Sequence, residues 1–134
     1  MTKCVFGKTE VEYLGHLVSA KGVSAEPTKL QAINSWPEPT NIKELRGFLG
    51  ITGYYRRFIW NYSKICSPLH GLLNKDSFVW TPAATTAFLQ LKAAMTTTPV
   101  LALPNYSKDF VVESDACGTG LGAVLMQDGR PIAY

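Results

Sequence analysis

The sequence predicts an α+β protein that has short strands near both ends and helices between them. Strand-forming residues fill the runs 4–6 and 11–19, which are bounded by turn residues at 7–9 and 21–22. A second β-type region spans 111–125, where an apolar run turns through glycines into another apolar run. Between these regions the apolar residues recur at helical spacing. Because two strands alone are marginally stable, we expect the N-terminal pair to need strands that the chain does not contain.

Four helices are predicted between the two β-type regions. The first spans 27–36 and ends before a proline-rich stretch, because proline disfavours helix in the residue before it. The second is capped by Asn41 or by the residue before it, with Glu44 as a capping-box partner. The third spans 62–73, and the fourth follows a Thr81-Pro82 start. The second helix carries the longest apolar stripe, which consists of Ile42, Leu45, Phe48, Leu49, Thr52 and Tyr55.

The composition excludes several classes of protein. With 134 residues, 46% of them hydrophobic, the chain is long enough to bury a core. No apolar run approaches the 18 residues of a membrane span, and the N-terminus lacks the apolar core of a signal peptide. The three cysteines have neither zinc-site nor disulfide-framework spacing. We therefore expect an intracellular protein with reduced cysteines, in a cytoplasmic particle or the nucleus, and no membrane partner.

Positive charge is concentrated in the middle third of the chain. Residues 41–75 contain six Lys and Arg residues against a single acidic residue, whereas the rest of the chain has seven against nine. A local basic block on an otherwise slightly acidic chain favours an anionic partner. A solvated helical face would give the same pattern. The six basic residues are Lys43, Arg46, Arg56, Arg57, Lys64 and Lys75.

A second stripe on the long helix lies opposite its apolar face. Glycine inside a helix costs about 1 kcal/mol relative to alanine, so glycines repeated on one face need a reason. One reason is that a nucleic-acid backbone lies against the helix while basic side chains pair with its phosphates. Alternatively, the glycines let another helix pack closely, or they break the helix. The stripe comprises Lys43, Gly47, Gly50, Tyr54 and Arg57, flanked by Arg46 and Gly53.

One acidic residue, Asp115, stands at the end of an apolar β-type run beside a glycine-rich turn. A carboxylate in that position is well placed to hold a hard divalent cation. Metal-dependent phosphoryl chemistry needs several carboxylates around two ions, and no other acid in the sequence is obviously arranged to join this one. The sequence therefore predicts an incomplete metal site at Asp115.

Several ordered segments together resemble the polymerase protein of gypsy-type LTR retrotransposons, of the plant type. Residues 11–19 resemble the last palm hairpin of the reverse transcriptase, and three segments resemble its thumb. The C-terminal part resembles the start of the ribonuclease H domain, whose hallmark is an Asp-Ala-Ser-x-x-Gly-x-Gly-Ala-Val-Leu run. The thumb-like segments are 29–37, 41–59 and 61–73, those like the connecting helix are 78–81 and 87–92, and the ribonuclease H-like segment is 110–134.

The resemblance implies that two parts of the chain bind nucleic acid. Tyr13, Leu14 and Gly15 fall where the family's primer grip holds the 3′ strand. The thumb helix of the family tracks the minor groove of the template-primer, in agreement with the glycine-rich stripe. The implied partner is an RNA–DNA hybrid or a DNA template-primer, next to the remainder of the Pol polyprotein. The full nucleic-acid-binding set is Tyr13, Leu14, Gly15, Lys43, Arg46, Gly47, Gly50, Ile51, Tyr54, Arg56 and Arg57.

The resemblance also gives Asp115 a catalytic role. It falls on the first of four acidic residues that bind two Mg²⁺ ions in ribonuclease H, where the ions activate water and stabilise the leaving oxygen. The other three acids would follow residue 134, and the polymerase's Tyr-x-Asp-Asp turn would precede residue 1. The chain is thus expected to be a fragment that grips nucleic acid and supplies one metal ligand, without catalysing either reaction alone.

The resemblance divides the chain into four parts. Residues 1–24 correspond to the end of the palm, 25–76 to a three-helix thumb, 77–104 to the connecting helix and linker, and 105–134 to the incomplete ribonuclease H-like domain. Two alternatives remain open at this point. One is a non-catalytic relic that keeps the thumb's hold on nucleic acid, and the other is an inert product of a decayed element.

Overall fold

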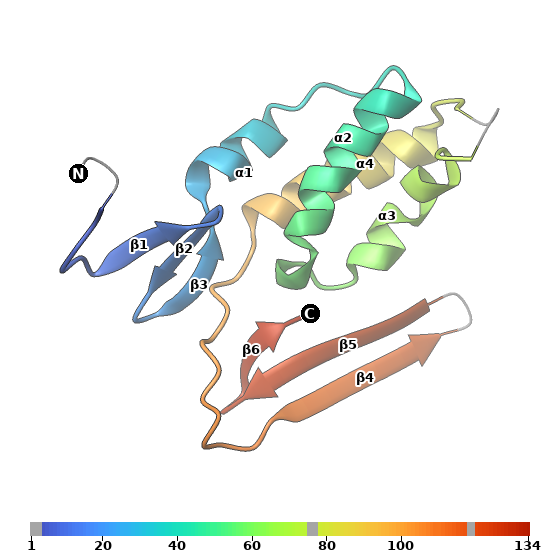
Figure 1. Cartoon of the computed structure of the whole chain (residues 1–134). Coiled ribbons are helices and arrows are strands. Elements are labelled where there is room, and N and C mark those ends of the chain that lie inside the picture. The colour runs from blue at the N-terminus through green and yellow to red at the C-terminus, as the bar shows by residue number, and fades with distance from the viewer. Residues whose placement is uncertain (1–3, 75–77, 118–119) are drawn as a thin grey trace.

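The computed structural model describes residues 4–74, 78–117 and 120–134, with the side chain of Cys117 left out. In the described residues, two three-stranded antiparallel sheets stand at the two ends of the chain, and four α-helices lie between them in sequence. Figure 1 shows the helices grouped together, with the N-terminal sheet to one side of them and the C-terminal sheet below. The predicted α+β class is therefore confirmed.

The N-terminal sheet differs from the predicted pair of strands. Its strands are β1 (Glu10–Tyr13), β2 (His16–Ser19) and β3 (Gly22–Ala25), paired in that order. Residues 4–6 form no strand, and the run 11–19 folds back on itself at Leu14 and Gly15. The third strand, β3, comes from within the chain, and pairing of this sheet with strands from outside the chain stays a prediction.

The four helices begin at their predicted residues, and side-chain caps hold the starts of two of them. They are α1 (Pro27–Asn34), α2 (Ile42–Tyr54), α3 (Tyr62–Gly71) and α4 (Pro82–Thr96). The Asn41 side chain accepts the Glu44 backbone N–H at 3.0 Å, and the Thr81 side chain accepts that of Ala84 at 3.2 Å. The Glu44 carboxylate in turn accepts the Thr40 N–H at 2.8 Å. This bond, with those from the Thr40 and Asn41 side chains, lowers the pKa of Glu44.

The core lies between α2, α3 and α4. Phe48 on α2 is fully buried, and its ring centroid lies 4.6 Å from that of Phe88 on α4. Cys66 and Leu69 supply the α3 side of the core. Burial raises the pKa of the Cys66 thiol to about 11, so at neutral pH it is a protonated, apolar core side chain.

The C-terminal sheet has one strand more than the predicted hairpin. Its strands are β4 (Val111–Cys117), β5 (Gly120–Gln127) and β6 (Arg130–Ala133), in that order. The turn into β6 is made by Asp128 and Gly129, both at positive φ, which is the Asp-Gly pair that two-residue hairpin turns favour. This signal was present in the sequence, and the hairpin prediction is corrected accordingly.

Backbone hydrogen bonds join the linker and the C-terminal sheet to the rest of the molecule. Val23 and Leu101 exchange two bonds of 2.8 Å, so the linker adds an isolated bridge to the edge of the N-terminal sheet. Ala102 then donates to Pro131 in β6, and Tyr134 donates to the Arg57 carbonyl at 2.9 Å. These bonds fix the C-terminal sheet against the turn that follows α2.

No helix in the described part of the chain has the length and apolar character that a membrane span requires.

Candidate nucleic-acid interface and metal carboxylate

The predicted second stripe lies on the exposed side of α2. Lys43, Gly47 and Gly50 are all exposed, and the Tyr54 side chain is half exposed. A Cβ added at Gly50 would meet nothing within 4 Å, and one added at Gly47 would lie 3.5 Å from the Trp36 ring. Among the described residues, therefore, no helix packs closely against Gly50. The close-packing explanation fails there, and α2 runs unbroken through both glycines.

Three other predicted residues sit differently from the stripe. Arg46 is exposed beside it, whereas Ile51 is partly buried against the core. Arg57 does not extend the stripe, because α2 ends at Tyr54 and residues 56–58 form a short 3-10 helix, η1 (Arg56–Phe58). Arg56 and Arg57 are both exposed on η1, and the Arg57 guanidinium lies 5.1 Å from the Phe58 ring centroid.

The β1–β2 turn lies against the C-terminal end of α2. Its two central residues are Leu14 at φ 49° and Gly15 at φ 75°, so a leucine occupies a left-handed conformation that bulky side chains rarely adopt. The Tyr54 hydroxyl donates to the Leu14 carbonyl at 2.5 Å, and the Tyr55 hydroxyl donates to the Gly15 carbonyl at 2.9 Å. The Glu26 N–H also donates to the Gly15 carbonyl. The turn is thus tied to the helical part of the molecule.

The side chains of the turn are exposed, whereas the tyrosine that holds it is buried. Tyr13 and Leu14 are 66% and 71% exposed, so both are available to a partner. Tyr55 is buried, and burial, with the neighbouring Tyr54 and Glu26, raises its pKa, so its hydroxyl remains a donor at neutral pH. The predicted contact at Gly15 lies beside this donor, because an added Cβ would come within 2.9 Å of the Tyr55 oxygen.

An aromatic cluster around His16 was not predicted from the sequence. The His16 ring lies 5.3 to 5.7 Å from those of Tyr54, Tyr55 and Phe58. Its Nδ1 is 3.0 Å from the Leu14 carbonyl, while its Nε2 is buried without a hydrogen-bond partner. No local pattern could have revealed this cluster, because its members lie about forty positions apart in the chain.

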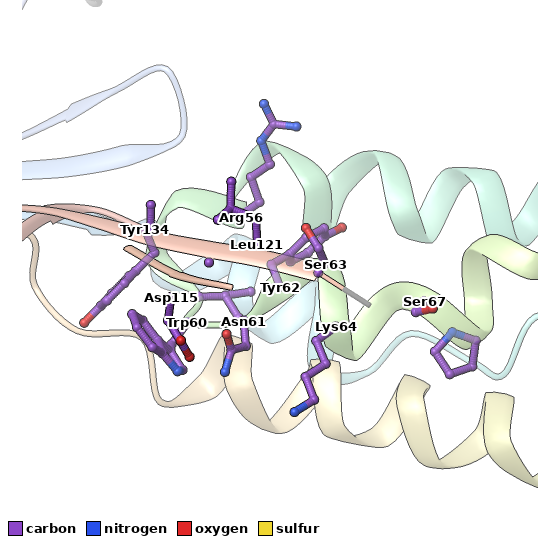
Figure 2. Close-up of a pocket in the computed structure, with 15 residues that line it drawn as sticks. Arg56, Trp60, Asn61, Tyr62, Ser63, Lys64, Ser67, Asp115, Leu121 and Tyr134 are labelled. Atoms are coloured by element: carbon purple, nitrogen blue, oxygen red, sulfur yellow. The ribbon is translucent and has the colours of Figure 1, made fainter. Parts of the chain in front are cut away.

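Asp115 faces a cavity of about 680 Å³ between the C-terminal sheet and the start of α3. Figure 2 shows Asp115 on the sheet, with Asn61 and Lys64 among the residues that line the same cavity. Arg56 also lines it, so a carboxylate and two cations share the space. Of the other basic residues in the predicted block, Lys75 lies outside the described residues.

The described residues do not form a complete Mg²⁺ site at Asp115. Asp115 is exposed, and it is the single acidic residue among those that line the cavity. No group of three or more His, Cys, Asp or Glu side chains with metal-binding geometry occurs in the described part of the chain. Mg²⁺ is commonly held by one or two carboxylates together with substrate phosphates. Asp115 supplies one carboxylate, and its two neighbouring cations supply no metal ligand, so further ligands would have to come from a substrate or from other residues.

Comparisons with known proteins relate the chain to reverse-transcriptase sequences. Residues 80–134 match the family model of the RNase H-like domain found in reverse transcriptase. An uncharacterized mitochondrial protein of Arabidopsis thaliana is 58% identical over 111 residues, covering 81% of this chain and 70% of that protein. The retrovirus-related Pol polyprotein from transposon 297 of Drosophila melanogaster is 45% identical over the whole chain, which spans 13% of the polyprotein.

Solved structures give the same result for the fold. The foamy viral protease-reverse transcriptase in complex with RNA/DNA hybrid superposes with a TM-score of 0.86 at 25% identity, over 95% of this chain and 18% of that one. Its dRH form in complex with ds DNA superposes equally well. Fold and sequence thus define the class as a reverse transcriptase region with an RNase H-like domain. The chain belongs to the family of retrotransposon and retroviral Pol polyproteins.

Proposed function

We propose that this chain is the thumb and the start of the ribonuclease H domain of a gypsy-type LTR retrotransposon reverse transcriptase. In this proposal, residues 25–76 hold an RNA–DNA hybrid or DNA template-primer, and the rest of the Pol polyprotein supplies the polymerase site. The observation that carries the proposal is the exposed stripe of α2, where open space over Gly50 lies on the same helix face as the basic side chain of Lys43. The proposal is supported by the foamy viral protease-reverse transcriptase structures, which are complexes with ds DNA and with RNA/DNA hybrid.

The stripe suits a nucleic-acid backbone for two physical reasons. Glycines without side chains let a backbone or groove approach the helix axis closely, and lysine and arginine at its ends neutralise phosphates. Binding of this kind is independent of sequence and weakens steeply as salt is added. The half-exposed Tyr54 ring and the exposed Leu14 continue the same surface onto the β1–β2 turn.

The Gly50→Ala substitution separates helix stability from binding. In the free protein the new methyl group meets nothing within 4 Å, so it should stabilise α2 by about 1 kcal/mol. The same methyl group would stand in the path of a closely approaching backbone. We therefore expect the affinity for a labelled RNA–DNA hybrid, measured by fluorescence anisotropy, to fall several-fold. The midpoint of urea unfolding of the free protein should rise.

Gly71→Ala is the matched control for this test. Gly71 is also an exposed helical glycine whose added Cβ meets nothing within 4 Å, but it lies at the end of α3. It should leave hybrid affinity at the wild-type value. Equal affinities of the Gly50→Ala and wild-type chains would contradict close approach at the stripe. A wild-type chain that binds no hybrid at low salt would reject the whole proposal and favour an inert product.

The proposal gives Asp115 the role of one Mg²⁺ ligand in a larger site. When bound, the metal would activate water for cleavage of the RNA strand. The chain's own contribution is a carboxylate held within β4, opposite Gly122 and beside the cavity, where Arg56 and Lys64 also attract phosphates. Those two cations hold a phosphate near the carboxylate but supply no second metal ligand.

The purified 134 residues should therefore bind hybrid without cleaving it. The assay contains Mg²⁺ on the order of 1–10 mM, because a single carboxylate is expected to bind the ion weakly. Under these conditions a labelled RNA strand should remain intact on a denaturing gel. The Asp115→Asn variant should behave identically. Efficient Mg²⁺-dependent cleavage by the wild-type chain that disappears in Asp115→Asn would show that the site is complete and overturn this part of the proposal.

A further inference from the structure

The β1–β2 turn is held in place by groups that lie far away in the sequence. Leu14 occupies a left-handed conformation that is unfavourable for a bulky residue, and such conformations persist where surrounding contacts enforce them. Each carbonyl of the turn lies within hydrogen-bonding distance of two groups. Tyr54 Oη and His16 Nδ1 lie near the Leu14 oxygen, whereas Tyr55 Oη and the Glu26 N–H donate to Gly15.

We propose that Tyr54 and Tyr55 are positioning residues that fix the tip of the β1–β2 hairpin to the end of α2. Through this tyrosine pair, the exposed Tyr13 and Leu14 side chains lie at a set distance from the stripe. The hairpin and the stripe then act on nucleic acid as one rigid surface, and this last step rests on the proposed function. Tyr54 is predicted to contact nucleic acid directly, and its hydrogen bond to Leu14 gives it a second role.

Tyr55 is buried at the point where it holds the turn. Its side chain is 2% exposed, so its hydroxyl has no access to a partner that lies on the molecular surface. Any effect of that hydroxyl on binding must therefore act through the turn. Its ring is also packed against Tyr54 at a centroid distance of 5.0 Å, so the two side chains are held together.

The test uses the isosteric variants Tyr54→Phe and Tyr55→Phe in the full 134-residue chain. Each removes one hydroxyl and keeps the ring in the aromatic cluster. By hydrogen exchange followed by mass spectrometry, the amides of β1 and β2 should exchange about tenfold faster in each variant, because a hydrogen bond that restrains the turn is lost. Peptides from α3 and α4 should keep their wild-type exchange rates.

Tyr62→Phe is the matched control. The Tyr62 hydroxyl lies 3.1 Å from the Thr52 side chain and also bonds to Cys66 within the helical part, so this variant also loses a bonded hydroxyl but leaves the hairpin untouched. Its β1 and β2 exchange should equal that of the wild type. Unchanged hairpin exchange in both Tyr54→Phe and Tyr55→Phe would overturn the proposal, whatever the chain binds.

A rescue variant distinguishes restraint of the turn from a general loss of stability. Leu14→Asn creates an Asn-Gly pair, which two-residue hairpin turns with positive φ at both positions favour. Combined with Tyr55→Phe, it should return hairpin exchange toward the wild-type rate, because the turn no longer needs external restraint. Failure of this rescue would count against a role at the turn.

Binding of a labelled RNA–DNA hybrid separates this inference from the function on which it rests. Tyr55→Phe should weaken binding several-fold and leave the slope of affinity against salt unchanged, because no phosphate contact is removed. Faster hairpin exchange with wild-type affinity would overturn the positioning role. A wild-type chain that does not bind the hybrid would instead reject the proposed function, while the exchange data would still decide whether the tyrosines hold the turn.

Discussion

Gly22→Ala is expected to destabilise the fold more than any other single methyl group added at a described glycine. The Cβ of an alanine would lie 2.0 Å from the Leu101 carbonyl oxygen and 3.1 Å from a Val100 methyl group. The linker would have to move away, which breaks both hydrogen bonds between Val23 and Leu101. Gly22 also has a φ of 135°, where other residues are strained. The steric clash, the lost hydrogen bonds and the backbone strain together should lower the free energy of unfolding by about 3–5 kcal/mol.

Gly129→Ala separates the backbone clash from the cost of a positive φ. Gly129 has a φ of 71°, but an added Cβ there meets nothing within 4 Å. Its replacement should cost about 1 kcal/mol, from backbone strain alone. Urea unfolding of both variants and the wild type, followed by tryptophan fluorescence, measures the difference. If the two variants lie within about 1 kcal/mol of each other, the bridge between the N-terminal sheet and the linker is not tight.

The helices were predictable because their signals are local. Asn41 and Thr81 bond to backbone groups three residues away; the sequence indicated the Thr81 cap and offered Asn41 as one of two neighbouring candidates. Residue propensities missed the first hairpin turn because leucine is not a turn residue, although the resemblance placed a hairpin at 11–19. The turn at Leu14 is held because the hairpin carbonyls bond to tyrosines forty residues away. A tertiary contact of that kind leaves no trace in a window of ten residues.

The candidate site was predictable to a similar extent. Helical periodicity placed Lys43, Gly47, Gly50 and Tyr54 on one face, and that face is exposed. The same periodicity failed at Arg57, because α2 ends at Tyr54 and Arg57 lies on η1. Periodicity assumes that a helix continues, and no local signal in the sequence marked this end. Tyr55, the residue that follows α2, bonds to the Gly15 carbonyl forty residues away.

Basic residues stand at both ends of the stripe on α2. Lys43 lies in the first turn of α2, while Arg56 and Arg57 lie beyond its other end on η1. A bound backbone that follows the stripe would thus meet positive charge at both ends of the glycine segment. Arg56 also lines the cavity of Asp115, so the same strand could extend from the stripe toward that carboxylate.

The triple variant Lys43→Ala, Arg56→Ala, Arg57→Ala is expected to lose affinity for an RNA–DNA hybrid on the order of 100-fold at 0.1 M salt, if each side chain neutralises one phosphate. The slope of log affinity against log salt concentration should become shallower by about 2 to 3, because fewer counterions are released on binding. Anisotropy titrations at several salt concentrations measure both quantities. The fold should survive, because all three side chains are exposed.

A second triple variant carries the same change in net charge at other places. Lys21, Lys29 and Lys108 are exposed and lie on the β2–β3 turn, on α1 and before β4, outside α2 and η1, and Lys108 pairs with Asp128. Their replacement by alanine lowers the overall positive charge equally but removes none of the proposed phosphate contacts. It should therefore keep most of the affinity and nearly the full salt slope. Equal losses in the two variants would mean that the hybrid responds to total charge, and the stripe of α2 would then have no special part in binding.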